Sequence, residues 1–325
     1  AAVDSPQYDF YTIPDAQVPG LSSANSITDL TDWYNKYAND FMTSISKTAG
    51  SYKNHLYSIN TLTPNIYTIL GYNVGLWEEI NKQDPSIEEP AKMFNDGNWD
   101  YSTFETYCIK CQAALNSIYG AESGYYCLSG WPSFYWVGMV DRNGSGVADV
   151  ANLKMNLTTD DCTAAGDTLK HIYDNGAFDG AFNVDGSVQS WTAGRSLFNT
   201  GELWFIGANQ GRWDLDMWGD GDQTRYGFVP FPAPDGYDRN HTYMGLVAEA
   251  CLVMASRRQN AYKGYGDDCN AENIYRALMT YFVKAIDEYK GEADYDPNKE
   301  YQRQAEKFFA TTESQKAFIT VSENL

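Results

Sequence analysis

Residues 66–81 read IYTILGYNVGLWEEIN, and this stretch contains the step that decides the fold. Ile66–Tyr72 is an apolar, β-branched run of strand length, and Leu76–Asn81 begins a short helix directly after it. Later in the chain, Leu203–Ala208 and Arg225–Phe231 have the composition of buried strands. Because such strands alternate with helices, the sequence predicts an α/β fold with largely parallel strand pairing.

The spacing of apolar residues predicts the helices that alternate with these strands. The predicted helices cover residues 27–46, 100–119, 161–175, 187–199 and 271–289, followed by two short helical pieces after residue 300. Gly176 stands where the third of them should end, since glycine readily adopts the left-handed conformation that stops a helix. Residues 244–256 form a long apolar run that predicts an extended segment.

Length and charge limit the possible functions. The chain has 325 residues, which favours two lobes over one, and 43% hydrophobic residues, which is enough for a buried core. No run approaches the roughly 20 apolar residues needed to span a bilayer. The formal net charge of -20 argues against binding to nucleic acids or anionic membranes and suits a neutral or cationic ligand.

Aromatic residues and cysteines leave alternatives open. The chain has 25 Tyr, 15 Phe and 9 Trp, which serve either in the core or as platforms that stack on sugar faces. The 6 Cys permit disulfides in an extracellular chain, but the spacing does not give their connectivity. Cys108 and Cys111 form a CxxC inside a predicted helix, where a structural role is favoured over a redox or zinc site.

Five stretches occur in an order that matches a known family. They are SITDLTDWY (26–34), ILGYNVGLWEEI (69–80), NDGNWDYSTFETY (95–107), WTAGRSLFNTGELWFIGANQGRW (191–213) and RYGFVPFPAPDG (225–236). Together they resemble the extracellular solute-binding proteins of ABC importers, specifically the large sugar-binding family that includes maltose-binding protein. Each motif alone is weak, and the ordered set carries the resemblance.

The resemblance implies a two-lobed, periplasmic-binding-protein-like fold with a cleft between the lobes. We expect residues 1–62 and 248–325 in lobe one and residues 63–247 in lobe two. Family members begin with a strand–helix–strand unit, whereas almost nothing precedes residues 26–34 here, so we expect an incomplete N-terminal lobe.

The implied function is extracellular capture of a sugar or oligosaccharide for delivery to the permease of an ABC transporter. We expect a bacterial monomer that has no enzymatic activity and no cofactor. We also expect it to be anchored to the outer face of the membrane by a lipidated N-terminus outside this sequence.

The ligand contacts that the resemblance suggests lie just after strands and at the two lobe crossings. We expect the ligand site to include Trp131, Trp136, Asn209, Gln210, Arg212, Trp213, Tyr243, Asn65, Tyr67 and Glu249. Aromatic rings at such positions cover apolar sugar faces, and the polar groups bond sugar hydroxyls. For each of them, packing in the core or a solvated position is the competing interpretation.

Two other function classes remain as alternatives. A glycoside hydrolase also binds sugars, but it needs two carboxylates about 5 to 9.5 Å apart, and no recognisable catalytic motif supplies that pair. A scaffold or adhesin could keep the fold without a ligand. Acidic loops at residues 141–152 and 214–222 only partly match a calcium loop, and ordinary turns explain both, so we expect no metal site.

Overall fold

The chain forms two compact units, each built from segments far apart in the sequence. The computed structural model describes residues 9–14, 17–37, 50–59, 66, 68–142, 146–149, 154–180, 190–191, 193–202, 226–237, 251–255, 266, 268–291 and 296–324. Unit 1 contains Ala1–Pro64, Asp149–Lys154 and Val247–Tyr295, and unit 2 contains Asn65–Ala148, Met155–Leu246 and Asp296–Leu325. None of the helices in the described segments is long and apolar enough to cross a membrane.

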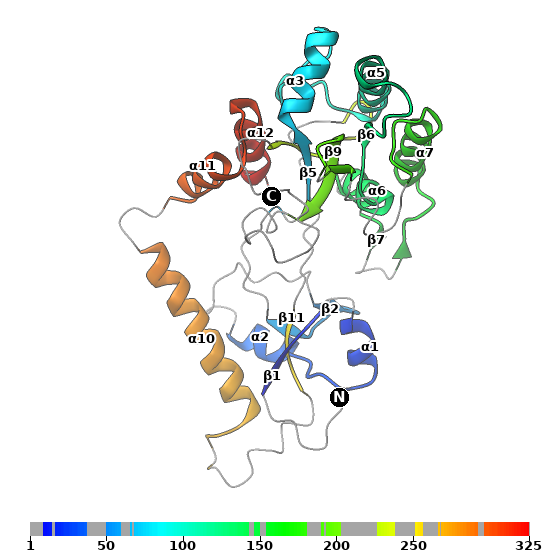
Figure 1. Cartoon of the computed structure of the whole chain (residues 1–325). Helices are drawn as coiled ribbons and strands as arrows, with labels where there is room; N and C mark the ends of the chain where they lie inside the picture. The colour runs from blue at the N-terminus through cyan, green and yellow to red at the C-terminus, as the bar shows by residue number, and fades with distance from the viewer. Residues whose placement is uncertain are drawn as a thin grey trace. The chain divides into compact units, whose positions relative to one another are not determined.

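Unit 1 has a three-stranded antiparallel sheet in the order β1-β11-β4 (Figure 1). Its elements are β1 (Phe10–Ile13), α1 (Val18–Ser23), α2 (Thr31–Tyr37), β2 (Ser51–Tyr52), β3 (His55–Leu56), β4 (Ser58–Ile59), β11 (Cys251–Met254) and α10 (Ala271–Lys290). Leu30, Tyr34, Met254 and Tyr275 form the centre of one buried cluster. Segments from both ends of the sequence therefore share one core.

Unit 2 is built on a four-stranded sheet in the order β10-β5-β9-β6. Its elements are β5 (Thr68–Asn73), α3 (Val74–Gln83), α4 (Pro90–Asn95), α5 (Tyr101–Tyr119), β6 (Tyr126–Leu128), α6 (Pro132–Asp141), α7 (Asp160–Asp174), β9 (Ser196–Glu202), β10 (Tyr226–Val229), α11 (Pro297–Phe308) and α12 (Thr312–Ser322). Two further short strands, β7 (Ala148–Asp149) and β8 (Lys154–Met155), pair with each other.

The helices of unit 2 begin at polar caps. The Asn73 side chain accepts a hydrogen bond from the Leu76 N–H (3.0 Å), so β5 passes directly into α3. Asp100 caps α5 in the same way, accepting from the Thr103 N–H at 2.9 Å. These side chains satisfy backbone donors that have no partner within the first turn of a helix.

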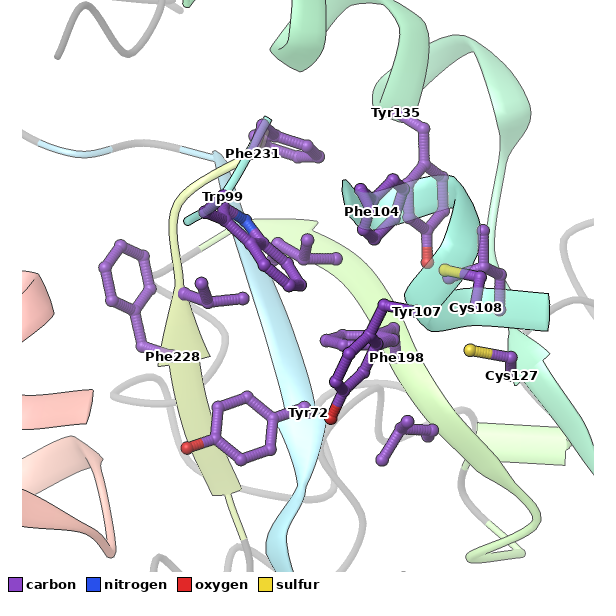
Figure 2. Packing of buried hydrophobic residues seen from close by; sticks show 14 of the residues in the cluster. Tyr72, Trp99, Phe104, Tyr107, Cys108, Cys127, Tyr135, Phe198, Phe228 and Phe231 are labelled. Atoms are coloured by element: carbon purple, nitrogen blue, oxygen red, sulfur yellow. The ribbon is translucent and has the colours of Figure 1, made fainter. Parts of the chain in front are cut away.

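The core of unit 2 is centred on aromatic rings (Figure 2). Phe198 of β9 packs against Phe104 and Tyr107 of α5, with ring centroids 6.0 Å apart in both pairs. Trp99 completes the group and contacts Phe104 edge-on at 5.4 Å. The Trp99 indole N–H also donates to the Pro230 carbonyl (2.8 Å), which satisfies its polar atom inside the core.

The C-terminal segment differs from the predicted lobe boundaries. The sequence analysis assigns residues 248–325 to lobe one, but the structure places Asp296–Leu325 in unit 2. The buried Ser314 hydroxyl of α12 lies 2.7 Å from the Tyr72 hydroxyl and accepts from the Phe228 N–H at 3.0 Å. The amphipathic pattern of a helix shows that one face is buried but does not identify the sheet that buries it.

Two predictions about strands are wrong. The sequence predicts largely parallel pairing, yet β5 is antiparallel to both β10 and β9, and β6–β9 is the parallel pair in the described part of this sheet. Residues 187–199 were expected to be helical; Ser190 and Trp191 are helical, but β9 begins at Ser196, so the prediction is wrong for residues 196–199. Residues 196–201 are buried on both faces of the sheet, so they lack the alternation of apolar and polar residues that marks a half-buried strand.

Candidate functional site

The structure describes two of the ten predicted site residues, Trp131 and Trp136. The remaining predicted contacts lie outside the described residues and stay predictions. They are Asn65, Tyr67, Asn209, Gln210, Arg212, Trp213, Tyr243 and Glu249.

Trp131 lies at the junction between β6 and α6. Strand β6 ends at Leu128, and α6 begins with Pro132 at its first position. A residue before proline favours an extended backbone, and Trp131 has φ -89° and ψ 124°. Because β6 and β9 are parallel, their carboxyl ends meet at one edge of the sheet, which is where ligands of open α/β sheets bind.

Hydrogen bonds between buried residues stabilise the loop that carries Trp131. The buried Ser129 hydroxyl donates to the Phe198 carbonyl (3.2 Å) and lies 3.3 Å from Asn199 Oδ1. The Tyr135 hydroxyl donates back to the Ser129 carbonyl at 2.8 Å. Gly130 has φ +94°, and a Cβ added there would lie 2.5 Å from Asn199 Oδ1, so both backbone conformation and space require glycine.

At the end of this loop and in the first turn of α6, two aromatic side chains form an exposed platform. Trp131 is 38% exposed and Phe134 is 39% exposed. Their rings stack with centroids 5.6 Å apart and planes 13° from parallel. The hydrogen bonds of Ser129 and the contact between the two rings hold these side chains in one arrangement without a ligand, which lowers the entropy cost of binding. We call Trp131 and Phe134 the aromatic platform.

Trp136 has a different environment from the platform. Its indole N–H donates to the Cys162 carbonyl of α7 at 2.9 Å, and its ring packs against the core of unit 2. It lines an open groove of about 440 Å³ between α6 and α7, together with Leu169 and Tyr173. Trp131 does not line this groove. The structure therefore does not bring the two predicted tryptophans to one surface, and Trp136 connects two helices.

Two polar residues under the platform loop escaped the sequence analysis. The side chains of Asn199 and Thr200 on β9 are buried, and both approach the position that a Cβ of Gly130 would occupy. Asn199 Nδ2 and Thr200 Oγ1 have no hydrogen-bond partner among the described residues. An unpaired buried donor costs free energy, so such groups call for a partner. The helix predicted for residues 187–199 ended at Asn199, so the strand that carries both Asn199 and Thr200 was not recognised.

Among the described residues, one carboxyl on the platform's own helix has a raised pKa. Burial raises the pKa of Asp141 to about 6. Asp141 ends the helix that Pro132 begins, so it lies roughly 10 Å along the helix axis from Phe134 and roughly 15 Å from Trp131. Among the described residues, no group of three or more His, Cys, Asp or Glu is arranged to hold a metal ion. The described part of the site therefore offers exposed aromatic rings for stacking.

Solved structures with the same fold are similar to this one over nearly its whole length. The galacto-N-biose-/lacto-N-biose I-binding protein of an ABC transporter from Bifidobacterium longum, in complex with lacto-N-biose, has a TM-score of 0.57 at 14% identity, covering 97% of this chain and 71% of that chain. An ABC transporter associated binding protein from B. animalis subsp. lactis Bl-04, in complex with beta-1,6-galactobiose, has a TM-score of 0.56 at 12% identity, covering 98% of this chain and 74% of that chain. UgpB from Mycobacterium tuberculosis, in complex with glycerophosphocholine, has a TM-score of 0.51 at 14% identity, covering 96% of this chain and 69% of that chain.

At these identities the structures establish the fold, and they confirm the predicted two-lobed α/β class. A search of curated protein sequences found no match. The family model of bacterial extracellular solute-binding proteins matches residues 1–260, which is most of the 325-residue chain. On this match, the chain belongs to the bacterial extracellular solute-binding proteins.

Proposed function

We propose that this protein captures a small carbohydrate outside the cell and delivers it to the permease of an ABC transporter. The observation that carries the proposal is the aromatic platform, which is exposed next to the carboxyl end of β6 and its hydrogen-bonded loop. Solved proteins of the same fold support it, since two of them were solved with disaccharides bound.

Stacking explains why a sugar suits this surface. A pyranose ring has one or two faces lined by C–H groups, and these faces bury apolar area against an indole or phenyl ring. Hydroxyls at the sugar edge need donors and acceptors, and the predicted polar contacts Asn209 and Gln210, which lie outside the described residues, would supply them. The net charge of -20 favours a neutral ligand over an anionic one. That the ligand lies in a cleft between two lobes remains part of the proposal.

We further propose that the protein does not turn over its ligand. The described carboxyl with a raised pKa, Asp141, lies about two helical turns beyond Phe134 on α6, so it is not positioned as an acid beside a stacked sugar. A glycoside hydrolase would instead need two carboxylates flanking the ligand. Incubation with di- to hexasaccharides should release no reducing ends above background, and enzyme-dependent cleavage would favour the hydrolase.

A ligand-free scaffold is the other alternative. Trp131 and Phe134 are exposed together next to the carboxyl end of β6, a position that favours ligand binding over a purely structural role. The same proposal includes a monomeric state and attachment to the outer face of the membrane through a lipidated N-terminus. Light scattering of the purified chain and lipid labelling in the native host test these two points.

A thermal-shift screen tests the proposal directly. The panel should contain neutral mono- to hexasaccharides together with glycerophosphocholine and choline, whose cationic headgroups can also lie on an aromatic face. Binding to the native state raises the melting temperature in proportion to ln(1 + [L]/Kd). We expect at least one carbohydrate to stabilise the wild-type protein. Stabilisation by the choline compounds alone would replace the carbohydrate with a cationic ligand, and no stabilisation by any compound would favour the scaffold.

Two variants assign the site in the same screen. Trp131→Ala should remove the shift, while Trp136→Phe should keep it, because Trp136 connects α6 to α7 and does not belong to the platform. Loss of the shift in Trp136→Phe, with retention in Trp131→Ala, would move the site to the groove between those helices.

A further inference from the structure

The helix that carries the aromatic platform packs along one face on a single residue, Phe231, which follows β10. The Tyr135 ring of α6 meets the Phe231 ring edge-on, with centroids 6.2 Å apart, and Figure 2 shows both side chains in the same core. A Cβ added to Gly138 would lie 2.5 Å from the Phe231 ring. One turn further on, Arg142 donates from its Nε to the Phe231 carbonyl at 2.8 Å. Positions 135, 138 and 142 share one helical face, so Phe231 supports α6 along nearly two turns.

The Arg142 guanidinium is buried without a carboxylate partner. Its side chain is 1% exposed, and none of the ion pairs between described residues includes it. Its Nη1 has no hydrogen-bond partner among the described residues. Burial lowers the pKa of Arg142 to about 10, so the group stays charged at neutral pH. A charge buried in this way costs free energy.

The favourable interactions of this charge are weak. Arg142 is the C-cap residue of α6, where the partial negative charge of the helix end attracts a cation. The guanidinium also lies over the Phe94 ring, 5.9 Å from its centroid. An apolar side chain of similar length would fill the same space without a buried charge, and such replacements are often neutral or stabilising. Stability alone therefore does not account for an arginine at this position.

The orientation of α6 sets the position of the platform. Trp131 precedes the first residue of α6 and Phe134 lies in its first turn, so both rings move with the helix. Trp131 lies roughly 16 Å along the helix axis from Arg142, and a tilt of roughly 10° about that end would move the ring by about 3 Å. Binding groups must be held within about 0.5 Å of their productive positions.

The hydrogen bond of Arg142 supplies a constraint that the apolar contacts lack. Ring contacts allow a helix to slide or turn, whereas a hydrogen bond depends on direction. The other side-chain hydrogen bonds of α6 join it to its own loop, to α5 and to α7. Among the described residues, the bond from Arg142 is the one that joins α6 to the segment after β10.

We propose that Arg142 is a positioning residue for the aromatic platform, because it fixes the orientation of α6 on Phe231 and thereby places the rings of Trp131 and Phe134. Its meaning for ligand binding rests on the proposed function. The position of Trp131, however, can be measured without a ligand, so the two proposals can fail separately. A purely structural role, in which Arg142 only stabilises the fold, is the competing interpretation.

Three variants of the full chain separate these interpretations. Arg142→Met keeps the length of the side chain and removes both the charge and the donor. Arg142→Lys keeps the charge and a donor but loses the planar guanidinium. Arg195→Met is the matched control, because Arg195 also has a buried nitrogen without a described partner, its Nε. Arg195 precedes β9, at the opposite end of that strand from the edge where the platform lies.

Fluorine NMR of protein labelled with 5-fluorotryptophan measures the position of the Trp131 ring. Its resonance is the one that disappears in Trp131→Phe, and the resonance of Trp77 on α3 serves as the internal reference. We expect Arg142→Met to melt within about 5 °C of the wild type and to shift the Trp131 resonance and its response to D2O. The shift should be smaller in Arg142→Lys and absent in Arg195→Met.

An unchanged Trp131 resonance in folded Arg142→Met would overturn the proposal, as would an equal shift in Arg195→Met. If Arg142→Met does not fold, Arg142→Lys decides: a shifted Trp131 resonance supports the positioning role, and an unchanged one assigns Arg142 to the fold alone.

Calorimetric titration with lacto-N-biose and beta-1,6-galactobiose, the disaccharides bound by two of the solved proteins, adds the functional readout. For a disaccharide that binds the wild type, we expect the Kd to rise at least tenfold in Arg142→Met and less than twofold in Arg195→Met. A shifted Trp131 with an unchanged Kd would contradict the platform as the ligand site but not its placement by Arg142. If neither disaccharide binds the wild type, the fluorine measurement alone decides.

Discussion

Replacing Trp131 with Ala should weaken solute binding about thirtyfold and leave the fold intact, as follows from the exposed area of its ring. A tryptophan side chain offers up to about 250 Å² of surface, so an exposed fraction of 38% leaves roughly 95 Å² available to a ligand. At about 25 cal/mol per Å², covering most of that area contributes about 2 kcal/mol. A loss of about 2 kcal/mol corresponds to roughly a thirtyfold rise in Kd.

Isothermal titration calorimetry with the best carbohydrate from the screen measures this change. Trp131 packs on Phe134 outside the buried core, so the melting temperature of the Trp131→Ala variant should stay close to that of the wild type. The matched control is Trp136→Phe, which keeps a ring in the α6–α7 groove and should bind normally. Unfolding of Trp131→Ala would show that the ring serves the core. An unchanged Kd with an intact fold would mean that the ligand lies elsewhere.

Further variants test the packing of the loop that carries Trp131 and the burial of the Asp141 carboxyl. Gly130→Ala should lower the free energy of unfolding by about 2 to 3 kcal/mol and abolish binding, whereas Gly120→Ala, with the same φ of +94° but nothing within 4 Å of its Cβ, should cost only about 1 kcal/mol. Equal losses in urea titrations of the two variants would contradict the role given to Asn199. Burial raises the pKa of Asp141 from 3.8 to about 6, so the folded state holds its proton more tightly than the unfolded chain, and stability falls as pH rises from about 4 to about 6. Asp141→Asn should therefore raise the free energy of unfolding by about 2 kcal/mol at pH 7 and leave it nearly unchanged at pH 4, and a variant that is no more stable at pH 7 would refute the sign. Trp213 lies outside the described residues. We expect the Trp213→Ala variant to fold normally and to lose binding, and the same calorimetric titration measures this loss.

The sequence predicts those helices and strands that have a polar cap or a long amphipathic pattern. The expected step from strand 66–72 to helix 76–81 corresponds to β5 and α3, and the cap at Asn73 makes the change of structure abrupt. The expected helix 100–119 corresponds to α5, which Asp100 caps and Gly120 ends. In these places local chemistry and tertiary packing favour the same structure, so the sequence is informative.

The pairing of strands could not be predicted in the same way. Side chains alternate identically in parallel and antiparallel strands, so the reversed direction of β5 leaves no mark in its composition. The burial of β9 on both faces removed the alternation that would have separated it from a helix. The family resemblance suggested Trp131, which the structure places between β6 and Pro132, and its role as a ligand contact stays a prediction. Asn199 and Thr200 were missed because their strand was not recognised.

One calorimetric titration tests the central claim most directly, that this extracellular solute-binding protein holds a carbohydrate on the aromatic platform. The full chain is titrated with neutral di- to tetrasaccharides at two temperatures, and Trp131→Ala is titrated in parallel. The account predicts saturable one-to-one binding to the wild type, with a negative heat-capacity change from burial of apolar area and a roughly thirtyfold weaker Kd in the variant. Saturable binding of equal strength in both proteins, or binding only of a charged non-carbohydrate solute, would contradict it.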